Sequence, residues 1–156
     1  AAGDVKNPFH TRLAVDLQRA VFHKGVSVLA ADRRQIEAAH RIGAPVVELH
    51  AGAYCDAHNE GRFTDRDAEL ERLREMSAYA HSLGLEVHVG HGLTFETAAP
   101  VAAFPEVMEL NIGHFLIGEA IFCGLDASIK RMRSLMDQAR AEAGGARSAG
   151  SVAVLD

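Results

Sequence analysis

The sequence contains only two cysteines, which form neither a CxxC pair nor a disulfide framework. We therefore expect Cys55 and Cys123 to be buried small residues rather than nucleophiles, in a protein of a reducing compartment, the cytoplasm. Basic residues are few, with 16 Lys and Arg against 21 Asp and Glu and a formal net charge of -5. Because no basic stripe is available to neutralise phosphates, nucleic acid is not expected as the main partner. The longest apolar runs fall far short of the roughly 20 residues that span a bilayer, so no membrane partner is expected.

The amino-acid composition is otherwise typical of a soluble globular protein, since 48% of the 156 residues are hydrophobic. A chain of this length forms one hydrophobic core and at most one ordinary domain. We place that domain in residues 1–143. From Gly144 onward the chain is rich in Gly, Ala and Ser, and residues 144–156 are predicted to be a flexible tail.

Strand-like and helix-like segments alternate along the chain. We predict strands at 26–31, 46–50, 85–89 and 108–112, the first of them buried. Helices are predicted around 13–21, up to Ile42, up to Leu83, at 96–103, at 115–122 and around 129–139. The second begins at the N-cap Asp32 and the third at the N-cap Thr64, and the helix at 115–122 is expected to be buried. Residues 51–63 are predicted to form a long polar loop. This alternation predicts a parallel α/β sheet with right-handed crossovers.

Three of the predicted strands carry apolar residues on one face and polar residues on the other. The opposed sets are Val47 and Leu49 against Glu48 and His50, then Leu85, Val87 and Val89 against Glu86 and His88, then Met108, Leu110 and Ile112 against Glu109 and Asn111. An open sheet covered by helices on both faces requires near-continuous apolar strands. One polar face instead fits a barrel whose helices lie outside and whose interior faces a ligand. We therefore favour half of an eight-stranded barrel over a four-stranded open sheet.

Two residues near the strand ends are candidates for acid–base chemistry. Glu48 points into the predicted lumen, where a carboxylate must be paired, hydrogen-bonded or neutralised. It is either half of a structural ion pair with an interior Arg or Lys, or a group that transfers protons or stabilises a cation. His91 lies between Gly90 and Gly92, which allow positive φ and the close approach of a ligand. It is either poised to exchange protons near neutral pH or a loop histidine without a role.

Gly113 and His114 follow the fourth predicted strand and open the next helix. A glycine at this junction leaves amide N–H groups free to hold a phosphate at the helix N-terminus. In barrels, the loops after the seventh and eighth strands often form a phosphate site, and Gly92 and Gly113–His114 would occupy those two places. We therefore expect phosphorylated small molecules as ligands.

A metal site is not predicted, although several histidines follow or lie in the strands. These are His50, His58, His88, His91 and His114. Neither HxH nor HExxH spacing is present, and interior histidines belong more often to hydrogen-bond networks.

Three segments, GAPVVELHAGAYCDA, SLGLEVHVGHGLT and PEVMELNIGHFLIGEAIFCGL, closely resemble the pyridoxine 5′-phosphate synthase family. The similarity covers roughly residues 24–143 and matches strands five to eight of the family's (β/α)8 TIM barrel. The resemblance implies an octamer that needs no organic cofactor or catalytic metal. It also implies condensation of 3-amino-2-oxopropyl phosphate with 1-deoxy-D-xylulose 5-phosphate to give pyridoxine 5′-phosphate, phosphate and water. By motif position, His91 corresponds to the proton donor, Glu48 to the transition-state-stabilising carboxylate, and Gly92, Gly113 and His114 to contacts with aminooxopropyl phosphate.

This chain also departs from the family that it resembles. It has His88 where the family often has Asn, and it lacks the family's N-terminal half, which supplies further catalytic groups. Half a barrel would expose two unpaired strand edges. Because the sequence also begins without Met, we expect a fragment of a longer synthase that is inactive alone. The alternatives are another phosphate-binding barrel, an aldolase or isomerase, and an inactive half-barrel that only binds phosphate metabolites or serves in an assembly.

Overall fold

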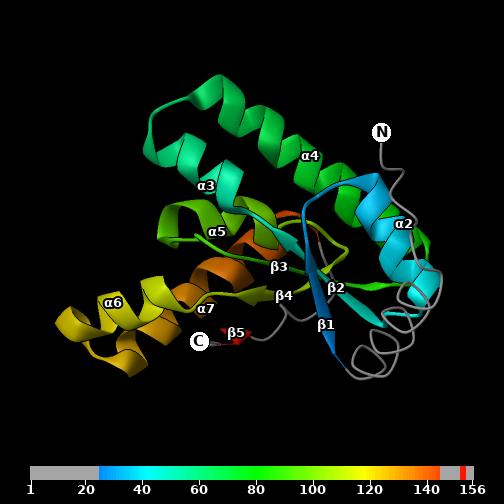
Figure 1. Cartoon of the computed structure of the whole chain (residues 1–156). Helices are drawn as coiled ribbons and strands as arrows, with labels where there is room; N and C mark the ends of the chain where they lie inside the picture. Colours follow the sequence, from blue (N-terminus) through cyan, green and yellow to red (C-terminus); the bar gives the residue numbers. More distant parts are fainter. Residues whose placement is uncertain (1–24, 145–151, 154–156) are drawn as a thin grey trace, which may run out of the picture.

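Five parallel strands form one sheet in the computed structural model, which describes residues 25–144 and 152–153. In sheet order these strands are β1 (Val26–Leu29), β2 (Val46–His50), β3 (Glu86–Gly90), β4 (Val107–Asn111) and β5 (Val152–Ala153). Their order in the sheet is their order in the chain, and a helix follows each of the first four (Figure 1). The predicted parallel α/β alternation is confirmed, and the sheet is part of a β/α barrel.

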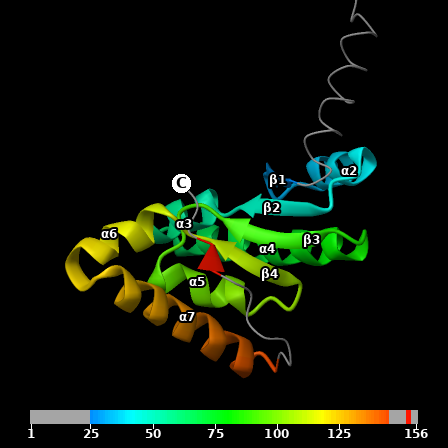
Figure 2. The ribbon, with the colours of Figure 1, turned by 90° about the horizontal axis from the view of Figure 1, so that it is seen from below.

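The helices pack against the sheet and against one another. They are α2 (Arg33–Ile42), α3 (Gly52–Asn59), α4 (Phe63–Ser82), α5 (Phe95–Ala102), α6 (His114–Cys123) and α7 (Leu125–Glu142). Figure 2 shows α4, α5 and α7 along one side of the sheet. Helix α4 contacts β2 and β3, α5 contacts β4, and α7 packs on α5. The helices therefore cover one face of the strands and leave the other free to form a lumen.

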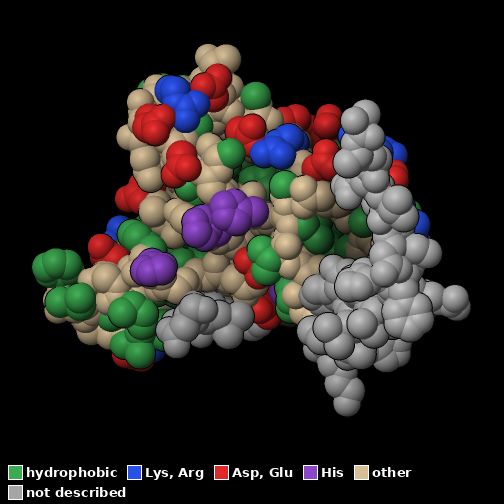
Figure 3. Space-filling model, in the orientation of Figure 1, with side chains coloured by type: hydrophobic (Ala, Val, Ile, Leu, Met, Phe, Trp, Pro, Cys, Tyr) green, Lys and Arg blue, Asp and Glu red, His purple; other side chains and the backbone are tan. Residues whose placement is uncertain are grey.

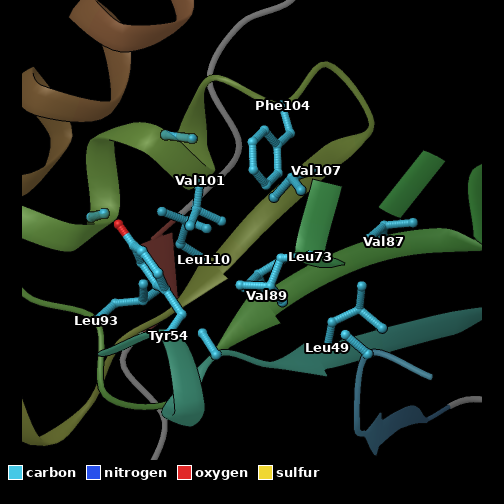
Figure 4. Close-up of a cluster of buried hydrophobic side chains, with 14 of the residues drawn as sticks. Leu49, Tyr54, Leu73, Val87, Val89, Leu93, Val101, Phe104, Val107 and Leu110 are labelled. Carbon is cyan, nitrogen blue, oxygen red and sulfur yellow. The ribbon is translucent and has the colours of Figure 1, made fainter. Parts of the chain in front are cut away.

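The hydrophobic core lies between the strands and these helices (Figure 4). The strands contribute a row of fully buried side chains, Val47, Leu49, Val87, Val89 and Leu110. The helices and loops contribute the buried side chains of Leu73, Val101 and Phe104 to the same core. Each such side chain contributes about 1.5–3 kcal/mol when it leaves water. This packing fixes which face of each strand points outward, and so which face points into the lumen.

The lumen face carries the polar residues of the alternating pattern. Val28 pairs in register with Glu48, Glu48 with His88, and His88 with Glu109. His88 is buried, with Nε2 2.8 Å from the Glu86 carboxylate on the same strand. The prediction of one apolar and one polar face is confirmed for β2 and β3, and for β4 with the exception of Met108.

A β-bulge interrupts the pairing of β3 with β4. Val87 pairs with Val107 and His88 pairs with Glu109, so Met108 has no partner residue on β3. Val107 takes the buried position, and Met108 is 37% exposed rather than buried beside Leu110 as the strict alternation predicts. An extra residue of this kind shifts the register by one, and it brings Glu109 and Asn111 onto the lumen face.

Helix α2 begins and ends at the predicted residues. The Asp32 carboxylate accepts hydrogen bonds from the amides of Arg34 at 3.0 Å and Gln35 at 3.2 Å. Gly43 ends the helix in the left-handed conformation, with φ of 80°. The Gln35 side chain accepts from the amide of Ala30 instead of completing a capping box with Asp32.

The predicted polar loop at 51–63 is wrong, because most of it forms helix α3. Tyr54, Cys55 and Ala57 are buried on one side of this helix, whereas its polar residues face solvent. Burial of this short apolar stripe outweighs the polar composition from which the loop was predicted. Helix α4 starts at Phe63, so Thr64 lies inside its first turn and is not its N-cap.

Two segments predicted to be buried are exposed over much of their length. In β1, at the edge of the sheet, Val26 is 38% and Val28 is 63% exposed. In α6, only Leu116 is buried, and the side chains of Ile121 and Phe122 are 79% and 87% exposed. Figure 1 shows the reason, since α6 projects beyond the end of the sheet and has α7 as its neighbour. Cys123, at the end of α6, is exposed as well, contrary to the prediction.

The remaining predictions on the fold concern the chain ends. Helix α7 buries Met132, Met136 and Ala139, as predicted from their spacing. The helix predicted around 13–21 and most of the predicted tail lie outside the described residues. Two residues of that tail, Val152 and Ala153, form β5 and pair with Leu110 and Asn111 of β4. None of the described helices has both the length and the apolar character that crossing a membrane requires.

Candidate active site

A pocket of about 720 Å³ opens at the carboxyl ends of the strands. It is lined by Val28, Glu48, His91, Gly92, Leu93, Asn111, Ile112, Gly113, His114 and Phe115. All five residues predicted to form the site, which lie in or just after three separate strands, are among them. The carboxyl ends of parallel strands are where α/β barrels place their active sites. Figure 3 shows histidine side chains gathered on this face of the molecule.

Glu48 projects from the middle of β2 into the pocket and is held there by an amide. The Nδ2 of Asn111, on β4, donates a hydrogen bond of 2.6 Å to the Glu48 carboxylate. Gly90, on the intervening strand, makes this contact possible, because a Cβ at Gly90 would overlap the Glu48 carboxylate. No Arg or Lys of the described residues forms an ion pair with Glu48. The described residues thus supply a hydrogen bond, and not the structural ion pair that the sequence left open.

His91 occupies a strained turn directly after β3. It has φ of 74°, the left-handed region, and it is the one non-glycine residue of the described chain with positive φ. Such a conformation costs an L-residue about 1–2 kcal/mol. Gly92 also has positive φ, at 80°, as predicted, whereas Gly90 does not and instead provides space for Glu48. Strain of this kind, held by the surrounding fold, is common at active sites.

The turn is supported from below by α3. The Sγ of Cys55 lies 3.8 Å from the carbonyl oxygen of His91, and a Cβ on Gly92 would lie 3.1 Å from the Cys55 Cβ. Burial raises the pKa of the Cys55 thiol to about 11. Burial likewise raises the pKa of the neighbouring Tyr54 to about 12, and its hydroxyl donates to the carbonyl of Thr97 at 3.3 Å. Cys55 is therefore a packing residue and not a nucleophile, as predicted.

Gly113 and His114 form the N-terminus of α6 at the rim of the pocket. Gly113 is the N-cap and has no side chain to bind the first amides of the helix. These amides and the helix dipole favour an anion at this end. His114, the first residue of the helix, is exposed and adds a side chain that can donate hydrogen bonds. The pair can thus hold a phosphate group beside His91 and Glu48.

The histidines considered as metal ligands do not assemble into a metal centre. Within residues 25–144, no group of three or more His, Cys, Asp or Glu side chains is placed to hold a metal ion. His50 and His91 instead stack, with their ring centroids 4.2 Å apart. His88 lies in the lumen between two carboxylates, with Nδ1 3.8 Å from Glu109 and Nε2 2.8 Å from Glu86.

The sequence did not single out two polar residues of this site. Asn111 was placed only on the polar face of its strand, and its hydrogen bond to Glu48 depends on the bulge that sets the register of β4. The sequence places His50 on the polar face of its strand and among the histidines considered as metal ligands, whereas its stacking partner His91 comes from the turn after the next strand. The sequence feature that could have identified both as site residues is their position at the carboxyl end of a strand, close in sequence to the candidate residues Gly113 and Glu48.

Comparison with known proteins agrees with the motif resemblance. A family model described as "Pyridoxal phosphate biosynthesis protein PdxJ" matches residues 12–138. A protein from Ruegeria pomeroyi named pyridoxine 5′-phosphate synthase is 78% identical over 113 residues, which are 72% of this chain and 46% of the relative. A protein with the same name from Roseobacter denitrificans is 72% identical over 72% of this chain and 45% of the relative. A third, from Caulobacter vibrioides, is 59% identical over 71% of this chain and 44% of the relative.

The chain spans about half the length of the curated relatives it matches. Its partial barrel agrees with this coverage, because the family has the complete TIM-barrel fold. With a family model matched over most of its length and with relatives of such high identity, the chain belongs to the PdxJ family of pyridoxal phosphate biosynthesis proteins.

Proposed function

We propose that the protein containing this chain is a pyridoxine 5′-phosphate synthase. It condenses 3-amino-2-oxopropyl phosphate with 1-deoxy-D-xylulose 5-phosphate and releases pyridoxine 5′-phosphate, inorganic phosphate and water. The observation that carries this proposal is the convergence of Glu48, His91, Gly92, Gly113 and His114 on one pocket. The name shared by the relatives supports the same activity.

His91 is the proton donor in this proposal. The reaction joins an amine to a ketone, eliminates phosphate, closes a ring and dehydrates it, so protons must be delivered to departing oxygen atoms. The left-handed turn holds His91 clear of the backbone of β3 and exposed to the pocket. A histidine can be protonated or neutral near pH 7, which suits repeated proton transfer.

Glu48 is the carboxylate that stabilises positive charge as the amine condenses. Its hydrogen bond to Asn111 fixes one oxygen and orients the carboxylate toward the pocket before substrate binds. A charge that is already in place where opposite charge develops costs no reorganisation during the reaction. The phosphate of 3-amino-2-oxopropyl phosphate then lies at Gly92, Gly113 and His114, where the N-terminus of α6 attracts an anion.

The proposal extends to assembly and location. A homo-octamer is proposed from the family resemblance, and the exposed Ile121 and Phe122 of α6 support burial of this helix against another surface. A cytoplasmic location is proposed because Cys55 and Cys123 are both free thiols. This 156-residue chain alone is expected to be inactive, because the described strands enclose only part of a barrel lumen.

The test measures formation of pyridoxine 5′-phosphate by the complete protein with both substrates present. Wild-type protein should turn over, and His91→Asn and Glu48→Gln should each lower kcat by about 10²–10⁴-fold while binding of 3-amino-2-oxopropyl phosphate stays nearly intact. His81→Asn is the matched control, since His81 is exposed at the end of α4, outside the pocket. Conversion of a single sugar phosphate without the amine would instead show an aldolase or isomerase. Binding without any turnover would show an inactive barrel.

A further inference from the structure

His50 and His91 come together at the ends of two neighbouring strands. His50 is the last residue of β2 and pairs in register with Gly90, so His91 follows one residue beyond the end of the ladder. The two imidazole rings stack with centroids 4.2 Å apart and an angle of 25° between their planes. His91 is thus in contact with a second ring along one face, while it also lines the pocket.

The ring of His50 is itself held in place by the start of α3. The amide N–H of Gly52 donates a hydrogen bond of 3.2 Å to Nδ1 of His50. Gly52 also leaves the space that the two rings occupy. A Cβ at this position would lie 2.5 Å from Cε1 of His50 and 3.4 Å from Cδ2 of His91. The stack therefore depends on a glycine at position 52.

This hydrogen bond also determines which form of His50 is present. Because Nδ1 accepts a hydrogen bond, the ring carries its proton on Nε2 and is neutral. Burial lowers the pKa of His50, and the neighbouring His91 lowers it further, against opposing effects of Glu48 and Asp56. A neutral His50 therefore places no positive charge in contact with the ring of His91.

We propose that His50 is a positioning residue, whose ring stacks on that of His91 and fixes its direction toward the pocket. The inference deepens the proposed function and rests on the role given there to His91. His50 is not among the residues that line this pocket, and it contacts the pocket residue His91 through the stacked rings. Its neighbour Ala51 is anchored by a hydrogen bond of 2.7 Å from its amide to the Gly90 carbonyl, which joins the two strand ends below the stack.

The experiment compares His50→Ala, His50→Phe and Gly52→Ala in the complete protein, with His40→Phe as the control. His40 is exposed near the end of α2, away from both rings. His50→Ala removes the stacked ring, His50→Phe keeps an aromatic ring of similar size, and Gly52→Ala displaces the His50 ring by its added Cβ. The readouts are the NMR signals of the His91 ring, together with kcat and KM for pyridoxine 5′-phosphate formation.

We expect the His91 ring signals to move in His50→Ala and Gly52→Ala and to stay near their wild-type positions in His50→Phe. The value of kcat should fall roughly tenfold to a hundredfold in the first two variants, with little change in KM, and His50→Phe should restore most of it. His91 signals and kcat that are unaffected by His50→Ala would overturn the inference. An equal loss of kcat in His50→Phe and His50→Ala would also overturn it, because the ring would not be the operative feature. If the wild-type protein makes no pyridoxine 5′-phosphate, the proposed function fails instead, while the NMR signals still report whether His50 orients His91.

Discussion

Asn111 and Glu48 are joined by a hydrogen bond of 2.6 Å that passes over the strand between them. Glu48 is on β2 and Asn111 is on β4, and Gly90 of β3 pairs with Asn111 in register. Any side chain at Gly90 would collide with the Glu48 carboxylate, and its Cβ would lie 3.0 Å from that of Asn111. Three neighbouring strands thus share one small polar cluster, in which a glycine is as necessary as the two polar groups.

The first prediction concerns the amide of Asn111. Asn111→Asp replaces the donor with a second carboxylate beside Glu48, and two like charges at this distance repel each other. A hydrogen bond to a charged group contributes about 1.5–3 kcal/mol, so kcat/KM should fall by roughly tenfold to a hundredfold or more. Steady-state kinetics of the complete protein measure this change. Asn59→Asp, the same substitution at an exposed position at the end of α3, should leave kcat/KM unchanged.

A second prediction concerns the space at Gly90. Gly90→Ala forces its Cβ against Glu48 and should lower the free energy of unfolding by about 1–3 kcal/mol. Gly118→Ala is the matched control, because Gly118 lies within α6 and an added Cβ there meets nothing within 4 Å. That substitution should raise stability by about 0.5–1 kcal/mol, since alanine favours the helix. Urea unfolding of both variants provides the measurement, and equal effects at the two glycines would contradict the geometry described for Gly90.

The strained backbone of His91 predicts that glycine and alanine at this position differ in stability although both remove the same side chain. His91→Gly and His91→Ala both remove the proposed proton donor, so both should lower kcat by about 10²–10⁴-fold. Only glycine relieves the φ of 74°. His91→Gly should therefore be more stable than His91→Ala by roughly 1 kcal/mol in denaturant unfolding. If alanine proved the more stable of the two, the left-handed turn would not exist in solution.

The two cysteines are predicted to differ in reactivity. Cys123 is exposed on α6, whereas Cys55 is buried and burial raises its pKa to about 11. In this chain on its own, at a pH of about 8, an aromatic disulfide reagent should react quickly with Cys123 and with Cys55 only after unfolding. Cys123→Ser should abolish the fast reaction, and Cys55→Ser should leave it intact. Fast reaction of Cys55 in the folded chain would show that α3 does not cover Cys55 as described.

The same burial predicts how stability depends on alkaline pH. The pKa of Cys55 rises from 9.0 to about 11 on folding, so the folded state keeps a proton that the unfolded state has lost between these values. The free energy of unfolding should consequently fall as pH rises from about 9 to 11. Replacing Cys55 with Ala should flatten this part of the stability profile, as followed by urea unfolding at several pH values.

Much of the fold could be predicted because its determinants are local. Asp32 and Gly43 mark the ends of α2 by their own side-chain and backbone chemistry, and no other part of the chain is needed for that. The alternation around Glu48 likewise identified the lumen face from the sequence alone. Helix α3 was missed because its apolar stripe is short and its stability comes from packing of Tyr54 and Cys55 under the rest of the fold.

The sequence by itself identified Glu48, His91 and His114 as site residues, since each lies within or just after a strand and a glycine adjoins both histidines. Their contacts were decided by the tertiary structure. Whether Asn111 reaches Glu48 depends on the bulge at Met108, and whether His50 stacks on His91 depends on the register of β2 and β3. Register is set by the packing of whole strands against the helices, and a slip of one residue would turn each of these side chains to the opposite face of the sheet. A sequence therefore specifies which chemical groups line a barrel, whereas their distances exist only once the strands have paired.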